Sequence, residues 1–572
     1  MNRRAALAAA PVLWLLLAAA PAALAADDLF QAIPDNTLGF VVVNRLAETS
    51  AKVVDIGNHL RVPAVNPLAV SKARAGIATG LDEQGSMAIV VVPGASENAD
   101  PAVIMLLPVS DYGKFIAQLH PTSGAPSSIT PVTLWDTKML VENVGHYALF
   151  VEPEHRAVLA HAAGPKRVVS DELADWRTWL AEKDVAGVVT SAGIQLIVKL
   201  AKRSGAEIQA AQAAGVMDFG EFDWIRFYLK PEFLAVAEPE VRSLALGVNW
   251  DSRGALRTVG RCAFWANGRA AKLCRALGPG VANGLAGLPA GQFAIGASVG
   301  VPDVARGWFV DQAVKAENAL AKNGRLKNGD VDKMAKLLRP LSGRISQCSL
   351  LLQADSHAES LLSQLFIRQQ VDDAGGFLDD FEKCLDGYNA IAKKSGDDLP
   401  VVQKKRTAIE GHATVEAVLD CGKLSGDDDP FGGGAESLGK VVGPEGKLVV
   451  DVAAAGKQQV AIGCINQKLL RRALQVAAKT ETGLADDKEV STIIAMLPGR
   501  ALLMIVARPQ GVISLMRGTG VPLPVFRATP PVGLAITTVD ADLEAHLVLA
   551  PEILSGAYAY FTGAMNNFSW GQ

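Results

Sequence analysis

The chain has 572 residues, of which 49% are hydrophobic and 20% charged, and it contains only six cysteines. These figures exclude intrinsic disorder, which needs low hydrophobicity and high net charge, and they exclude a small disulfide-rich scaffold. The formal net charge of −4, without a basic block, lacks the electrostatic pattern that nucleic-acid binding requires. We therefore expect a folded protein of about two to four domains, with no nucleic acid among its partners.

Residues 1–25 have the pattern of a signal peptide. Two arginines near the N-terminus precede an apolar stretch at 5–20, and small residues before Ala25 form a cleavage site. The alternative is an uncleaved membrane anchor, because the apolar stretch is just long enough to span a bilayer. Pro11 inside this stretch and the cleavage site favour the signal peptide. We expect an exported protein, periplasmic or extracellular, that is cleaved near Ala25 and has no transmembrane span in its mature chain.

Along the mature chain, hairpins of apolar strands are followed by helices. In chain order the predicted hairpins lie at 86–109, 138–151, 242–265, 447–463 and 532–550, and the helices that follow them lie at 112–119, 153–163, 267–277, 465–478 and 551–564. Apolar and polar residues alternate along the strands, as expected for antiparallel strands with one buried face. A helix after each hairpin can cover that face. The pattern predicts an α+β fold, built mainly of antiparallel sheets with packed helices.

Two halves of the chain, residues 26–280 and 287–572, present these units in a similar order. Each half opens with a proline before an apolar strand, Pro34 in the first and Pro289 in the second, and proline is tolerated where a strand begins. A polar loop at 425–446 lies within the second half. A duplication, and hence an internal repeat, explains this order. The alternative is that hairpin-and-helix units recur independently in α+β proteins.

Two of the six cysteines are candidates for a disulfide bond, which an exported protein can form. Cys262 lies in a strand-like stretch and Cys274 in the helix-like stretch that follows it, so the two are neighbours in one local unit. The alternative is that the cysteines are buried thiols, which behave as small apolar residues. The sequence leaves both alternatives open.

Several short motifs resemble catalytic or binding sites, but their surroundings argue against those functions. Residues 434–440 match the spacing of a phosphate-binding loop, yet they lack the following Ser or Thr and the flanking strand and helix. Ser191 lies between a strand and a helix but lacks the first glycine of a nucleophile elbow. The acidic run at 427–429 does not have the spacing of a calcium loop, and the eight histidines form no zinc motif. No catalytic residue, cofactor-binding residue or metal ligand is therefore predicted.

The segment 219–233 is unusually aromatic in a chain with only 6% aromatic residues. It is the best candidate for a surface that binds a partner or a membrane. The alternative is that its aromatic side chains pack against the sheet. The candidate interaction residues are Phe219, Phe222, Trp224, Phe227 and Tyr228.

Short motifs at the strand entries are similar to those of a known group of proteins. Ile33-Pro34 followed by Thr37-Leu38 gives the pattern Pro-x-x-Thr-Leu, and Leu288-Pro289 and Leu497-Pro498 also precede apolar strands. The chain thereby resembles large exported bacterial proteins of unknown function, abundant in planctomycetes, with repeated Leu-Pro-x-x-Thr-Leu units. The resemblance implies an α+β fold and export, but no activity, cofactor or catalytic residue.

These observations leave the biochemical function unknown and favour a non-enzymatic exported protein. We expect it to bind a partner protein or to associate with the cell envelope. One alternative is an exported hydrolase whose site is assembled from distant residues. Another is a carrier of a small ligand or lipid, held between the two halves.

Overall fold

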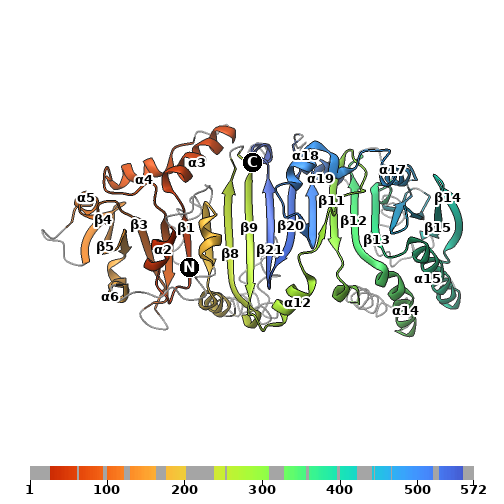
Figure 1. Cartoon of the computed structure of the whole chain (residues 1–572), viewed down its shortest axis with the longest axis horizontal. Helices are drawn as coiled ribbons and strands as arrows, with labels where there is room; N and C mark the ends of the chain where they lie inside the picture. The colour runs from red at the N-terminus through yellow and green to blue at the C-terminus, as the bar shows by residue number, and fades with distance from the viewer. Residues whose placement is uncertain are drawn as a thin grey trace, which may run out of the picture. The chain divides into compact units, whose positions relative to one another are not determined.

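The computed structural model describes most of the chain after residue 25 and divides it into two compact units (Figure 1). The first unit contains Met1–Leu273 and Ala541–Glu544, and the second contains Cys274–Asp540 and Ala545–Gln572. No helix within the described ranges combines the length and the apolar character that a membrane span requires. The described residues are 26–60, 64–94, 99–121, 129–162, 176–200, 202, 238–251, 254–307, 328–355, 360–395, 400–421, 441–443, 445–465, 467–518, 527 and 529–557.

The first unit contains an antiparallel sheet in the order β4-β5-β6-β3-β2-β1-β7-β8-β9. Its strands are β1 (Gly39–Val43), β2 (Met87–Val92), β3 (Ala102–Pro108), β4 (Ile129–Leu134), β5 (Thr137–Val144), β6 (Tyr147–Val151), β7 (Val185–Val189), β8 (Val241–Trp250) and β9 (Leu256–Phe264). Its helices include α2 (Ala26–Ala32), α3 (Leu46–Leu60), α4 (Pro67–Ala75), α5 (Tyr112–Ala117), α6 (Arg156–Ala162) and α8 (Arg177–Ala181), and α12 (Arg269–Leu277) follows β9.

Both faces of this sheet are packed against helices, because successive side chains of a strand point to opposite faces. On β1, Phe40 and Val42 join the core that is covered by α2, α6 and α8. Val43 points the other way and joins the core that contains residues of α3 and α5. The short apolar strands found in the sequence are thus buried on two sides.

The second unit contains an antiparallel sheet in the order β14-β15-β16-β17-β13-β12-β11-β19-β20. Its strands are β11 (Phe293–Gly300), β12 (Ile345–Gln353), β13 (Leu365–Val371), β14 (Gln403–Ile409), β15 (His412–Asp420), β16 (Lys447–Ala454), β17 (Gln459–Cys464), β19 (Leu503–Ala507) and β20 (Val532–Val539), after which comes β21 (Asp542–Leu549). A two-residue pair joins β10 (Val281–Ala282) to β18 (Arg500–Ala501). Its helices include α14 (Asn328–Arg344), α15 (Ala374–Ser395), α17 (Gln467–Ala477), α18 (Lys488–Ile494) and α19 (Pro509–Gly518).

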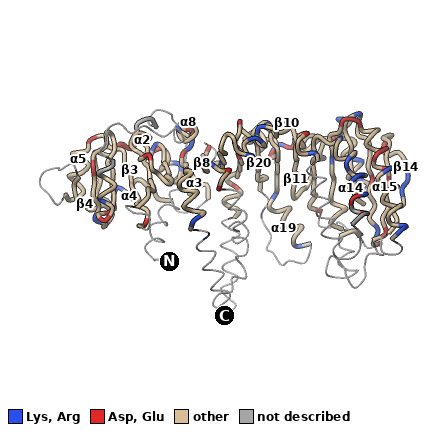
Figure 2. Tube along the Cα trace, turned by 90° about the horizontal axis from the view of Figure 1, so that it is seen from below, with Lys and Arg blue, Asp and Glu red and all other residues tan. Residues whose placement is uncertain are grey.

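Helices also cover both faces of the second sheet. Leucines of α17 and apolar residues of α18 pack on one face, and α14 and α15 pack on the other. Basic residues of α14 and of the edge strand β14 pair with acidic residues of α15 (Figure 2): Arg344 pairs with Asp380, and Arg406 pairs with Asp379. Charged residues on an edge strand discourage pairing with another chain.

The two units have the same strand order. When β11, β12 and β13 are matched with the first three strands, and β15, β16, β17, β19 and β20 with β4 to β8, these eight strands follow one another in the same order in both sheets. The edge strand β14, beside β15, and the strand β9, beside β8, lie outside this match. The α+β fold is therefore confirmed, with antiparallel sheets and packed helices. The common origin of the two halves, and their boundaries at 26–280 and 287–572, stay predictions.

A glycine at the same position in each unit supports this match. Gly193 follows β7 and Gly511 follows β19, each four residues after the strand ends. An added Cβ would lie 1.9 Å from the carbonyl oxygen of Leu38 at the first position and 2.4 Å from that of Phe293 at the second. Only glycine allows such a close approach to the first strand of each sheet.

Candidate functional site

The aromatic segment 219–233 lies outside the described residues, but the chain on either side of it is placed. The described residues stop at Lys202 and resume at Glu238, and these two form an ion pair with an N–O distance of 2.8 Å. The interval 203–237 thus begins and ends at one place on the first unit. The predicted role of the segment as an interaction patch stays a prediction.

Exposed apolar side chains gather on the elements that adjoin this interval. Ile197 and Leu200, on the helical residues 191–200 before it, are 48% and 51% exposed. Leu244 and Leu246, on β8 after it, are 42% and 47% exposed. We call these four residues the neck surface.

Local packing holds the two parts of the neck surface on the same face of the sheet. Ile194 and Val198 are buried against Val189 of β7, so the helical residues 191–200 lie on the face to which Val189 points. Val189 is the Cα partner of Leu244, and paired residues point to the same face. Ile197 and Leu200 are three residues apart, on one side of the helix.

The neck surface does not lie in a basic region. Between residues 197 and 246 the sequence has six basic and seven acidic residues. Surfaces that bind anionic lipid or nucleic acid carry an excess of lysine and arginine. This balance favours a protein as the binding partner.

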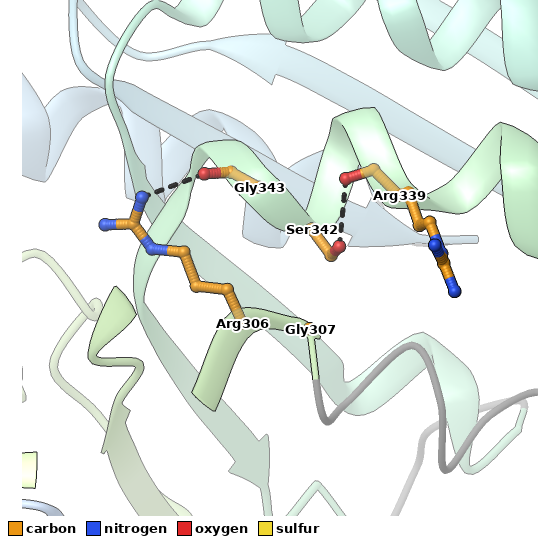
Figure 3. A pocket seen from close by; sticks show the side chains of 5 residues that line it. All are labelled: Arg306, Gly307, Arg339, Ser342 and Gly343. Atoms are coloured by element: carbon orange, nitrogen blue, oxygen red, sulfur yellow. Dashed lines mark hydrogen bonds between the residues drawn. The ribbon is translucent and has the colours of Figure 1, made fainter. Parts of the chain in front are cut away.

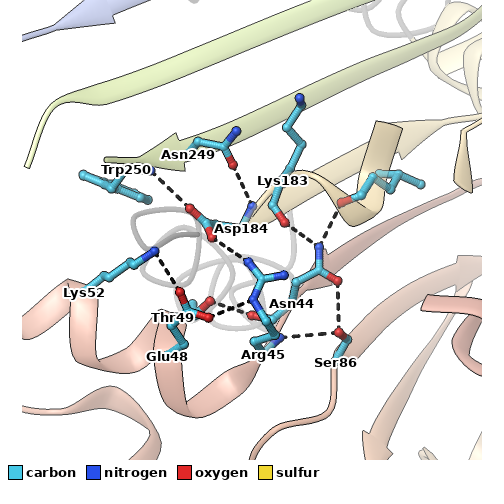
Figure 4. A network of polar contacts seen from close by, with 11 residues as sticks. Asn44, Arg45, Glu48, Thr49, Lys52, Ser86, Lys183, Asp184, Asn249 and Trp250 are labelled. Atoms are coloured by element: carbon cyan, nitrogen blue, oxygen red, sulfur yellow. Dashed lines mark hydrogen bonds and ion pairs between the residues drawn. The ribbon is translucent and has the colours of Figure 1, made fainter. Parts of the chain in front are cut away.

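A second feature of the first unit is a buried polar network at the end of β1 (Figure 4). Asn44 is buried there, and its amide nitrogen donates to the carbonyl oxygens of Leu180 and Lys183, at 2.9 and 2.6 Å. Its side-chain oxygen accepts a hydrogen bond from the hydroxyl of Ser86 at 3.0 Å. Asn44 thereby ties the end of β1 to the chain segments before β2 and β7.

Arg45 and Asp184 form the charged part of this network. Arg45 is 5% exposed and has a φ of 46°, a left-handed conformation that is uncommon for a residue with a side chain. Its Nη2 lies 3.1 Å from Oδ1 of Asp184, and its Nε lies 3.0 Å from Glu48 on α3. Lys52, one turn further along α3, pairs with the other oxygen of Glu48 at 3.1 Å.

One feature of the sequence is related to this network. Asn44 and Arg45 directly follow one apolar strand, and Asp184 directly precedes another. Polar residues at strand ends are common, however, and nothing local indicates that these two strands are antiparallel neighbours. The network is visible only once β1 is paired with β7.

The second unit has apolar residues at the corresponding position. The N–H of Asn44 donates to the carbonyl oxygen of Asp184 at 2.9 Å, and in the second unit Gly300 N–H donates to Leu502 at 2.8 Å. Leu502 therefore stands where the first unit has Asp184. The fold itself does not require a carboxylate at this junction.

The second unit contains two adjoining open hollows of about 270 and 230 Å³ that share Arg306. The larger is lined by Arg306, Arg339, Ser342 and two glycines (Figure 3). Nη1 of Arg306 donates to the carbonyl oxygen of Gly343 at 2.9 Å, in the last turn of α14. Arginine commonly satisfies helix carbonyls in this way, so its structural role is to cap α14.

The remaining candidates from the sequence give no catalytic arrangement among the placed side chains. Ser191 begins the helical residues 191–200, where the nearby Gly193 is explained by its approach to β1. Residues 427–429 and 434–440 lie outside the described residues. In the described part of the chain no group of three or more metal-ligating side chains gathers. Cys262 lies on β9 and Cys274 on α12, and their disulfide bond stays a prediction.

Comparison with protein-family models, with curated proteins and with solved structures finds no match to the chain. The arrangement of its own residues therefore carries the functional argument.

Proposed function

We propose that the protein is exported, is not an enzyme, and binds another protein of the cell envelope through the neck surface and the adjoining aromatic segment. The observation that carries the proposal is the exposure of four large apolar side chains next to the ends of the interval 203–237. Exposed apolar groups that cluster in this way mark binding sites, whereas scattered ones do not. Aromatic residues are enriched at the centres of protein interfaces. The segment 219–233 contains six aromatic residues.

The balanced charge of the region supports a protein partner over an anionic membrane or a nucleic acid. The resemblance to exported bacterial proteins agrees with a role in the envelope but assigns no activity. Export rests on the sequence of residues 1–25. The N-terminal sequence of the protein from its native cells tests it: a chain that begins at Ala26 supports export and cleavage, and a chain that keeps residues 1–25 contradicts them.

Site-specific photo-crosslinking in the native cells tests partner binding. A benzophenone amino acid replaces Leu246 of the neck surface, and in a matched control it replaces Val70 on α4, which is 48% exposed in the same unit. We expect a protein adduct of defined mass at position 246 and not at position 70, and its loss when Leu244 is changed to Ser. Equal labelling at the two positions, or adducts with lipid alone, would overturn the proposal.

A further inference from the structure

The helix α12, which follows β9 (Figure 1), presents basic and apolar side chains together on its outer side. Arg269 and Lys272 are exposed there, and Leu273 is 50% exposed. Residues three and four positions apart lie on the same side of a helix, so Arg269 faces solvent together with Lys272 and Leu273. The opposite side of α12 is buried through Ala271 and Cys274.

Trp265 places a large aromatic side chain beside the start of this helix, and 43% of it is exposed. The N–H of Trp265 donates to the carbonyl oxygen of Glu240 at 3.0 Å, and the carboxylate of Glu240 accepts from the N–H of Ala270 at 3.0 Å. One residue thus holds Trp265 and the first turn of α12 together. We call Trp265, Arg269, Lys272 and Leu273 the α12 surface, and all four lie in the first unit.

The α12 surface is basic, in contrast to the neck surface. No acidic residue occurs between positions 252 and 302 of the sequence, and α12 itself carries Arg269, Lys272 and Arg275. Within the described part of the chain, Arg269 and Lys272 form no ion pair. The acid that contacts this helix, Glu240, is half-buried and accepts from a backbone N–H of its first turn. The two exposed positive charges therefore face solvent without a compensating acid.

An anionic lipid surface fits this combination of groups better than an acidic protein does. Tryptophan is enriched at the level of the lipid headgroups, and helices that lie on membranes combine Lys and Arg with Trp and Leu. Lysine, by contrast, is depleted at protein interfaces. Each basic side chain close to an anionic membrane strengthens binding about fivefold.

We propose that the first unit docks on membranes that contain anionic phospholipid through the α12 surface. Trp265 and Leu273 lie at the level of the headgroups, and Arg269 and Lys272 contact the phosphate groups. This contact is peripheral, and it agrees with the finding that no described helix has the character of a membrane span. The α12 surface shares no residue with the neck surface, so lipid binding requires no protein partner.

Photo-crosslinking of the full-length protein to lipid vesicles tests this docking. A benzophenone amino acid replaces Leu273, which keeps an apolar group at this position. In a matched control it replaces Val103 on β3, which is 47% exposed in the same unit. The vesicles contain equal parts of phosphatidylglycerol and phosphatidylcholine, or phosphatidylcholine alone. We expect lipid adducts at position 273 with the anionic vesicles only, and none above background at position 103.

A charge variant tests the basic residues. At subsaturating lipid, Arg269→Gln with Lys272→Gln should lower the yield of adduct at position 273 about 25-fold, or about fivefold for each charge. The matched control, Arg74→Gln with Lys114→Gln, removes two exposed charges elsewhere on the same unit and should leave the yield unchanged. Raising the salt concentration from about 0.1 M to about 1 M should also lower the wild-type yield, because salt screens the charges.

Four results would overturn the proposal. Three of them are equal yields at positions 273 and 103, equal yields with the two kinds of vesicle, and a yield that does not change when Arg269 and Lys272 are replaced. The fourth is a protein adduct at position 273 in the native cells without a lipid adduct, which would assign the α12 surface to a protein partner. The comparison of the two kinds of vesicle decides the question even if the charge variant fails to fold.

Discussion

Gly193 provides the sharpest test of how the neck surface is held in place. It lies where the helical residues 191–200 come closest to the start of β1, and an added Cβ would lie 1.9 Å from the carbonyl oxygen of Leu38. The clashing atom belongs to the backbone of Leu38, a buried residue directly before β1, so it cannot turn aside as a flexible side chain would. We expect Gly193→Ala to push the helix away from β1.

The size of the effect follows from the contacts that this movement would break. The N–H of Thr190 donates to Leu38 O at 3.1 Å, and its hydroxyl donates to Thr37 O at 2.7 Å. Overpacking a well-filled site costs about 1–3 kcal/mol, and each lost buried hydrogen bond about 1 kcal/mol. The free energy of unfolding of the first unit should therefore fall by about 3–5 kcal/mol.

Denaturant unfolding followed by tryptophan fluorescence measures this change. The fully buried Trp176 and Trp250 both lie in the first unit and report on it. Gly113→Ala on α5 is the matched control, because its added Cβ meets only Asp111 Oδ1 at 3.6 Å, an ordinary contact. A glycine-to-alanine change in a helix is neutral or slightly stabilising there. Equal unfolding midpoints for the two variants would refute the argument.

Two further predictions concern the second unit and the cysteines. Asp451 on β16 is buried opposite Glu416, and burial raises its pKa, so its ionisation lowers stability as the pH rises. At pH 7, Asp451→Asn should raise the unfolding midpoint of the second unit by an amount equivalent to about 1 kcal/mol. At pH 4 the increase in the midpoint should be smaller. A larger increase at pH 4 than at pH 7 would contradict this prediction. If Cys262 and Cys274 form a disulfide bond, we expect four of the six cysteines to react with a thiol reagent in the unfolded, unreduced protein. Six reactive thiols would exclude this disulfide bond.

Much of the local structure was predictable because it depends on the spacing of apolar residues. The expected hairpin at 86–109 corresponds to β2 and β3, and the expected helix at 465–478 corresponds to α17. The edge hairpin of β14 and β15 was not among the predicted elements. Along β14 the residues Gln403 to Arg406 are all exposed, so the alternation that marks a half-buried strand is missing.

The candidate sites were less predictable. The aromatic segment was found from composition, but its neighbours Leu244 and Leu246 look like ordinary strand residues in the sequence. Alternation predicts that one face of β8 is buried, and only the assembled sheet determines how far each face is covered.

The sequence by itself determined that this chain forms antiparallel strands with packed helices, because strand and helix periods are local properties of the chain. The tertiary structure alone decided that β1 lies between β2 and β7, and that both units use the same strand order. It also brought Asp184 to Arg45 across 139 positions of sequence. Which strands pair depends on the packing of the whole sheet, and no local pattern contains that information.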